Sequence, residues 1–212
     1  MHFLTRSLAF LALLLTVILP AADPALAQSA GKPELFDVWS EAVASGWMGD
    51  GEFGEKHVRL FEAWKEAPHS DSICIKVTYE PGPKKWAGIY WQNEPDNWGD
   101  EPGWDLAAAG YTRITFWAKG ENGGEVVEFK AGGIAAPGKK HKDSFEVTAR
   151  PRKIMLTNEW KQHTISLDQQ NLSSVIGVFC WVANATSNPA GITFYLDDIS
   201  YERETQESED SP

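Results

Sequence analysis

The chain has 212 residues and a formal net charge of −11, with 30 acidic side chains against 19 Lys and Arg. Such an acidic protein repels phosphate backbones and anionic membrane surfaces, so we expect neither a nucleic-acid partner nor insertion into a membrane. The length is enough for one domain with a sizeable hydrophobic core.

The N-terminal segment has the features of an export signal. Arg6 gives a positive start, residues 8–19 are almost wholly apolar, and Ala25-Leu26-Ala27 forms a small-x-small cleavage site. An apolar run of 12 residues is too short to span a bilayer as a helix, which needs about 20 residues. We therefore expect a signal peptide over 1–27, cleavage after Ala27, and a secreted or periplasmic mature protein.

The remaining sequence is typical of β-structure. Residues 72–79 alternate well, with Ile73, Ile75 and Val77 on one face, and clusters of Gly, Pro and Asn separate such segments. We expect strands over 72–79, 86–92, 112–119, 125–131, 161–167, 175–183 and 192–201, with one short helical turn over 105–109. Strands without crossover helices favour a single antiparallel sandwich over 28–202, followed by a disordered acidic tail over 203–212.

Tryptophan is unusually abundant, and none of the ten lies in the first 38 residues. A tryptophan ring either packs in a core or offers a flat stacking surface to a ligand, which in an exported protein is often a sugar ring. Both roles stay open for the set as a whole. The ten residues are Trp39, Trp47, Trp64, Trp86, Trp91, Trp98, Trp104, Trp117, Trp160 and Trp181.

Aromatic rings and side-chain amides alternate in one short region, and sugar recognition needs that mixture of stacking area and hydroxyl partners. The alternative is a core strand followed by a structured loop. The candidate residues of this region are Trp86, Tyr90, Trp91, Gln92, Asn93, Asn97 and Trp98.

Further candidates come from later strands. Glu128 and Lys130 share one face of their strand and would hydrogen-bond to sugar hydroxyls, or else form a surface ion pair that contributes little. Trp181 and Asn184 form a second aromatic–amide pair. Trp117 lies on a strand with large apolar groups on both faces, which either is central in a sandwich or lines a groove.

Two cysteines, Cys74 and Cys180, lie in strand-like segments about a hundred residues apart. Export permits a disulfide, but sequence alone says nothing about their distance, and two buried free thiols are an equal alternative.

Three segments of the chain resemble jelly-roll carbohydrate-binding modules with a galactose-binding-like fold. They read DLAAAGYTRITFWAKG over 105–120, EWKQHTISL over 159–167 and FYLDDI over 194–199. The resemblance implies an all-β, antiparallel jelly-roll β-sandwich, and binding of a glycan or polysaccharide on a concave sheet face. We expect Trp91 or Trp117 as the stacking platform, with Gln92, Glu128 and Lys130 as hydroxyl partners.

The resemblance also implies a structural calcium site. An acidic residue of the closing strand, Asp198, would join an early acidic residue, Asp37, Glu34 or Glu41. Calcium takes six to eight oxygen ligands. The sequence has no clean early motif, and charge at a strand end is the alternative interpretation.

Two further classes of function stay open. A jelly-roll polysaccharide-degrading enzyme, a glycosidase or lyase, would place a pair of carboxylates in a groove and raise a carboxyl pKa. The sequence has no compact catalytic carboxylate signature, no zinc-ligand spacing and no nucleophile motif, so we expect binding without catalysis. An envelope or matrix domain that contacts another protein would instead expose a large apolar patch.

Overall fold

A computed structural model describes residues 35–203 of the chain. The expected signal segment, most of the expected tail and the candidate residue Glu34 lie outside this range. The strands form two sheets, and every strand pair within each sheet is antiparallel. No helix of the described residues is long and apolar enough to cross a membrane.

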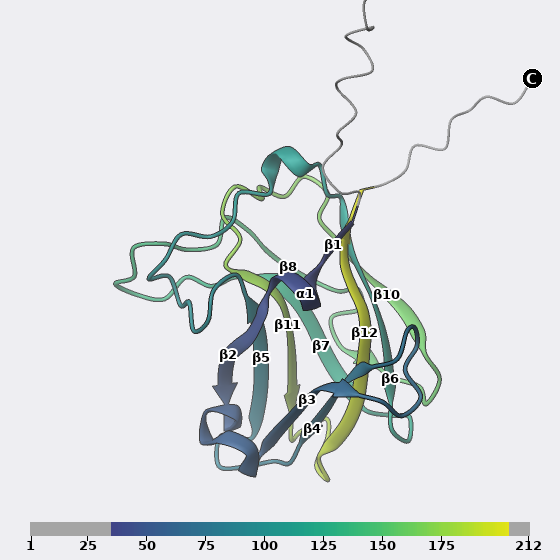
Figure 1. The fold of residues 1–212 in the computed structure, drawn as a ribbon. Helices are drawn as coiled ribbons and strands as arrows, with labels where there is room; N and C mark the ends of the chain where they lie inside the picture. The colour runs from purple at the N-terminus through teal and green to yellow at the C-terminus, as the bar shows by residue number, and fades with distance from the viewer. Residues whose placement is uncertain (1–34, 204–212) are drawn as a thin grey trace, which may run out of the picture. The chain divides into compact units, whose positions relative to one another are not determined.

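The first sheet, which we call sheet A, contains six strands (Figure 1). Its strand order is β10 (Lys161–Ser166), β6 (Arg113–Gly120), β12 (Ile192–Glu202), β4 (Cys74–Tyr79) and β3 (Val58–Trp64), and β1 (Leu35–Asp37) pairs with β12. The first and last described strands are therefore neighbours, with Leu35 opposite Glu202.

The second sheet, sheet B, also contains six strands, and four of them run side by side in Figure 1. Its order is β2 (Val43–Gly49), β5 (Trp86–Gln92), β11 (Gly177–Asn184), β7 (Val126–Gly132) and β8 (Glu146–Thr148), and β9 (Ile154–Met155) pairs with β7. Helix α1 (Val38–Glu41) and the 3-10 helices η2 (Asp50–Lys56) and η3 (Ala107–Ala109) connect strands.

The core lies between the two sheets, because alternate residues of each strand point inward. Phe116 of β6 contacts Phe129 of β7 with ring centroids 4.7 Å apart, and Phe179 of β11 at 5.2 Å. Trp181 packs edge-on against Phe194 of β12 at 5.3 Å. These rings come from both sheets, so aromatic packing joins the two layers of the sandwich.

The predicted fold class is confirmed, and each of the seven predicted strands corresponds to a strand of the structure. The sequence analysis missed β1, β2, β3, β8 and β9. The β2 sequence, VASGWMG, contains two glycines and a register shift, which interrupt the alternation that identifies a strand. The other missed strands are short or have exposed side chains on both faces.

A buried carboxylate fixes the connection between β4 and β5. Asp50 accepts hydrogen bonds from the backbone N–H groups of Gly82 and Lys84, at 2.8 and 2.7 Å, and from the Tyr79 hydroxyl at 3.1 Å. Burial alone would raise the pKa of Asp50, but these hydrogen bonds outweigh it and hold the pKa below its ordinary value. The Asp50 carboxylate thus joins η2, which lies between β2 and β3, to the turn that leads into β5.

Both cysteines are buried free thiols, which decides between the two alternatives left by the sequence. Cys74 of β4 points away from the core between the sheets. Side chains alternate along the strand, and Ile75 and Val77 are the ones that point into the core. Cys180 of β11 packs with Tyr90 in a separate cluster outside the main core. The two thiols therefore lie on opposite outer faces of the sandwich.

Candidate functional site

The outer face of sheet B, the face turned away from the core, brings together six of the predicted site residues. Tyr90 and Lys130 both lie opposite Cys180, on the two strands that flank β11. Asn184 lies opposite Trp86, and Glu128 opposite Val182. Because alternate residues share a face, these pairs place the following side chains on one surface: Trp86, Tyr90, Gln92, Glu128, Lys130 and Asn184.

The centre of this face is built on a buried tyrosine. The Tyr90 hydroxyl donates a 2.9 Å hydrogen bond to the Gly132 carbonyl oxygen, and the ring is only 2% exposed. Burial raises the pKa of this phenol, so it stays neutral. The Lys130 ammonium lies 5.0 Å from the centroid of the Tyr90 ring, a cation–π contact. Tyr90 therefore positions Lys130, and Lys130 is the accessible group of the pair.

Residues 93–103 cover one end of the face. Trp98 packs edge-on against Tyr90 at 6.2 Å. Gln92 donates from Nε2 to the Asn97 carbonyl oxygen at 2.8 Å, and Asn93 donates from Nδ2 to the Pro102 carbonyl oxygen at 2.8 Å. Both amides are buried and bonded within the protein. The prediction that Gln92 and Asn93 contact sugar hydroxyls is corrected: they hold this loop in place.

A carboxylate that the sequence analysis missed fastens the same end. Asp143 accepts hydrogen bonds from the backbone N–H groups of Ile134 at 2.7 Å, Ile176 at 2.5 Å and Gly177 at 3.2 Å. Burial raises its pKa although these hydrogen bonds oppose the shift. Asp143 thus ties the connection between β7 and β8 to the start of β11. No local motif marks it, because its partners are backbone groups distant in sequence.

The opposite end of the face is open. Trp86 is 38% exposed, one of the few large apolar side chains with that much accessible surface. Glu128 accepts a 2.8 Å hydrogen bond from Nε of Arg152, and Lys153 lies 3.4 Å from the Ser187 hydroxyl. Arg152 and Lys153 were not among the predicted site residues, although they belong to a basic run in an acidic chain. The Arg152–Glu128 pair lies on β7 and in the connection after β8, and Glu128 is two strands away from Trp86 on β5.

Trp91 and Trp181 do not belong to this face, and the prediction of Trp91 as a stacking platform is corrected. Both rings are 0% exposed and point into the core between the sheets. Trp91 packs against Phe179 at 5.9 Å. Their strands carry apolar residues on both faces, so the pattern alone did not show which face points inward.

Trp117 lies on the outer face of sheet A, on the other side of the sandwich from Trp86. The His69 ring stacks on it with centroids 3.6 Å apart and an interplanar angle of 17°. Nδ1 of His69 lies 2.8 Å from Oδ2 of Asp198. The backbone N–H of His69 donates a hydrogen bond to Asp197. One face of the Trp117 ring is therefore covered by the protein. Trp117 cannot share a ligand with Trp86, because the two rings lie on opposite sides of the sandwich.

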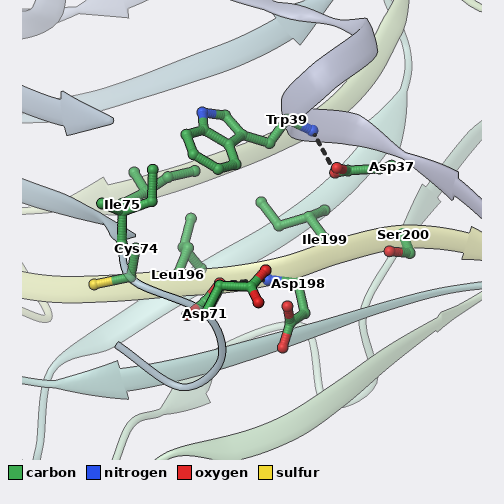
Figure 2. A pocket seen from close by; sticks show the side chains of 11 residues that line it. Asp37, Trp39, Asp71, Cys74, Ile75, Leu196, Asp198, Ile199 and Ser200 are labelled. Atoms are coloured by element: carbon green, nitrogen blue, oxygen red, sulfur yellow. Dashed lines mark hydrogen bonds between the residues drawn. The ribbon is translucent and has the colours of Figure 1, made fainter. Parts of the chain in front are cut away.

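The predicted calcium ligands Asp37 and Asp198 line one cavity of about 280 Å³ beside β12, together with Asp71 and Asp197 (Figure 2). Their oxygens already accept hydrogen bonds: Asp37 from the Trp39 backbone N–H at 2.9 Å, Asp198 from Ser70 and His69. Within residues 35–203, no group of three or more His, Cys, Asp or Glu side chains is placed to hold a metal ion. These carboxylates alone do not fit the oxygen shell of calcium, and calcium binding stays a prediction.

The groups on the outer face of sheet B suit recognition of hydroxyls and ring faces. Burial raises the pKa of three carboxyl groups, Glu62, Asp143 and Asp197. Glu62 and Asp197 belong to strands of sheet A, and the oxygens of Asp143 are bonded to the backbone. Two further carboxylates lie on the face: Glu128, which is paired with Arg152, and Glu146, which is exposed on β8.

Comparison with solved structures places the fold among carbohydrate-binding modules. A family 30 module gives a TM-score of 0.53 at 16% identity, covering 84% of this chain and 91% of that chain. A family 11 module of a cellulosomal cellulase of Clostridium thermocellum gives 0.51 at 14% identity, covering 82% and 96%. A Clostridium thermocellum family 11 module in complex with a β-1,3-1,4-mixed-linked tetrasaccharide gives 0.50 at 16% identity, covering 80% and 94%.

No protein-family model matches the sequence, and a search of curated proteins gave no match. The structural likeness extends over most of both chains in each comparison, so it describes the whole sandwich and not one motif. The chain has the antiparallel jelly-roll β-sandwich fold of these modules.

Proposed function

We propose that this protein binds carbohydrate, without catalysing a reaction, on the outer face of sheet B. One observation carries the proposal: three neighbouring strands place an exposed indole, an ammonium and an amide on the same surface, at Trp86, Lys130 and Asn184. Stacking area beside a few polar groups is what a sugar site requires. The likeness to carbohydrate-binding modules supports the same function.

In this proposal Trp86 is the stacking platform, in place of Trp91 and Trp117. Its ring is accessible, and it lies at the end of the face that residues 93–103 leave open. Lys130 and the Arg152–Glu128 pair supply hydrogen-bond donors and an acceptor for hydroxyl groups. Tyr90, Gln92 and Asn93 support the surface from below and from one end.

The test is a Trp86→Ala variant, titrated calorimetrically against a panel of soluble polysaccharides that includes a mixed-linked β-glucan. Loss of the stacking surface weakens binding by about tenfold or more, since about 1.4 kcal/mol corresponds to a factor of ten. Trp117→Ala is the matched control, because it removes an indole from the opposite sheet. Unchanged affinity of the Trp86 variant, with weakened binding of the Trp117 variant, would assign the site to sheet A instead.

We also propose that the protein acts outside the cytoplasm, after removal of residues 1–27. The sequence pattern supports this proposal. Mass spectrometry of the protein purified from its natural host tests it, with an N-terminus at Gln28 as the expected result. A mature protein that retains Met1 or the apolar run 8–19 contradicts it.

A further inference from the structure

The charges of this chain are unevenly distributed. Residues 128–153 contain seven of the 19 Lys and Arg and three of the 30 Asp and Glu. The rest of the sequence has 12 basic and 27 acidic residues, so a strongly acidic protein has one basic segment. Charge of one sign gathered on one part of a surface favours a ligand of the opposite sign.

The basic segment borders the outer face of sheet B. It begins on β7 with Lys130 and continues through the connections before and after β8. In the first connection, Lys139 pairs with Asp100, and the His141 backbone N–H donates to the Gly99 carbonyl oxygen. Those contacts hold it against the loop that covers one end of the face. After β8, Arg152 contacts Glu128 near the other end.

Lys130 is the cation of this segment that lies on the outer face of β7, within the proposed site. Its neighbour on the face, Glu128, is already paired with Arg152, and Lys139 is paired with Asp100. None of the ion pairs within residues 35–203 involves Lys130, whose ammonium instead lies over the Tyr90 ring. A partly exposed ammonium that is held in a fixed position and forms no ion pair with Glu128 or Glu146, the carboxylates on the same face, is suited to a ligand carboxylate or sulfate.

The spacing of the groups indicates a ligand of several sugar rings. Trp86 and the Lys130 partner Tyr90 are four residues apart on β5, which is about 13 Å along the strand. Lys130 lies two strands away, across β11. One ring over Trp86 therefore cannot also reach Lys130, whereas a chain that crosses the sheet meets both.

We propose that the natural ligand is an acidic polysaccharide, whose carboxylate or sulfate groups bind at Lys130 while a neighbouring ring stacks on Trp86. This inference rests on the proposed glycan-binding function and specifies its substrate class. The likeness of the fold to carbohydrate-binding modules favours this occupant over nucleic acid.

The experiment compares polymers that share a backbone and differ in charge. The pairs are polygalacturonate with its methyl ester, carboxymethylcellulose with hydroxyethylcellulose, and carrageenan with its desulfated form. We expect the acidic member of one pair to bind at least about tenfold more tightly than its neutral partner, and to weaken as NaCl rises from about 50 to about 300 mM.

Two variants locate the charge effect. Lys130→Gln is expected to lower affinity for the acidic polymer about tenfold and to leave binding of the neutral polymer unchanged. Lys161→Gln is the matched control, because Lys161 is an exposed lysine on β10 of sheet A, and it is expected to bind like the unmodified protein. Circular dichroism melting confirms that both variants are folded.

The outcomes separate the inference from the proposed function. Equal or tighter binding of the neutral member in every pair overturns the acidic ligand and leaves glycan binding intact. Equal effects of Lys130→Gln and Lys161→Gln overturn the role of Lys130. Binding of single-stranded DNA as tight as that of the acidic polymer overturns the preference for a sugar chain. No binding to any polymer contradicts the proposed function itself.

Discussion

Individual buried polar side chains decide how the connections of this sandwich meet its sheets. Asp50 and Asp143 each accept hydrogen bonds from several backbone N–H groups, and most of these groups lie more than 30 residues away in the sequence. Acidic residues in a sequence are expected at the surface, so neither was predicted as a buried anchor. Their partners are backbone groups, which carry no side-chain signal that sequence analysis can detect.

Replacing Asp143 by Ala is expected to destabilise the protein by at least about 2 kcal/mol, because it leaves buried N–H groups of Ile134, Ile176 and Gly177 without an acceptor. Urea denaturation followed by tryptophan fluorescence measures the change. Asp100→Ala is the control, since Asp100 forms an exposed ion pair with Lys139 and its loss costs about 1 kcal/mol or less. Similar losses in both variants would mean that Asp143 is not an anchor.

His163 makes stability depend on pH. Burial, and secondarily the charge of Lys161, lower the pKa of His163 below its ordinary value of 6.5, and its ring stacks on Phe116. The unfolded chain therefore takes up a proton before the native protein does. Above the unfolded pKa both states are neutral at His163, so the free energy of unfolding does not depend on this residue's titration. It decreases as the pH falls below 6.5 toward the native pKa.

The His163→Gln variant is expected to lose less stability than the unmodified protein between about pH 7.5 and pH 5.5, because Gln does not take up a proton. Chemical denaturation at a series of pH values measures the two curves. Parallel curves over this range would show that His163 titrates alike in both states.

At the scale of elements, the strands were more predictable than the direction in which their side chains point. Alternation identified seven strands, yet β5 and β11 carry large apolar groups on both faces. The register of β11 with β5 and β7 decides that Phe179 and Trp181 point inward while Cys180 points outward. The sequence named Trp86 and Lys130 as candidates but did not show that Trp91 is buried in the core, and the role of Trp86 and Lys130 in binding stays a prediction.

The local stability of residues 67–70, which precede β4, is expected to depend on Trp117. Residues 67–70 lie against sheet A through the His69–Trp117 stack, the bond from Trp160 Nε1 to the Ala67 carbonyl oxygen, and the bonds from His69 and Ser70 to Asp197. Trp117→Ala removes the stacking surface, so backbone hydrogen exchange at 67–70 becomes faster by about tenfold while that of β5 and β7 is unchanged. Mass-spectrometric hydrogen exchange tests this, and unchanged protection at 67–70 contradicts it.

At the scale of the whole molecule, each of the two sheets presents its own set of aromatic and charged side chains on its outer face. The outer face of sheet B carries Trp86, Tyr90 and Lys130. The outer face of sheet A carries Lys76 and Lys119 over aromatic rings, and the carboxylates Asp71, Asp197 and Asp198 line the cavity beside β12. Net charge and composition describe only the sum of these surfaces. The separation depends on topology, because each sheet combines strands from distant parts of the sequence.

The same separation predicts the redox behaviour of the protein. Cys74 and Cys180 lie on opposite outer faces, and burial raises the pKa of both thiols, that of Cys74 to about 11. We expect dithiothreitol to leave the melting temperature unchanged, and Ellman's reagent to label two thiols per chain only after denaturation. Rapid labelling of the native protein, or a lower melting temperature under reducing conditions, would contradict this arrangement.

The pairing of β1 with β12 has a consequence for engineering. Leu35 and Glu202 are opposite each other in an antiparallel ladder, so their Cα atoms are about 5 Å apart. Residues 35–202 are therefore suited to insertion as a cassette into a surface loop of another protein, since the host loop needs to open by only that width. Both junctions would lie on sheet A, which leaves the outer face of sheet B free to work as the sensing surface of a chimeric reporter.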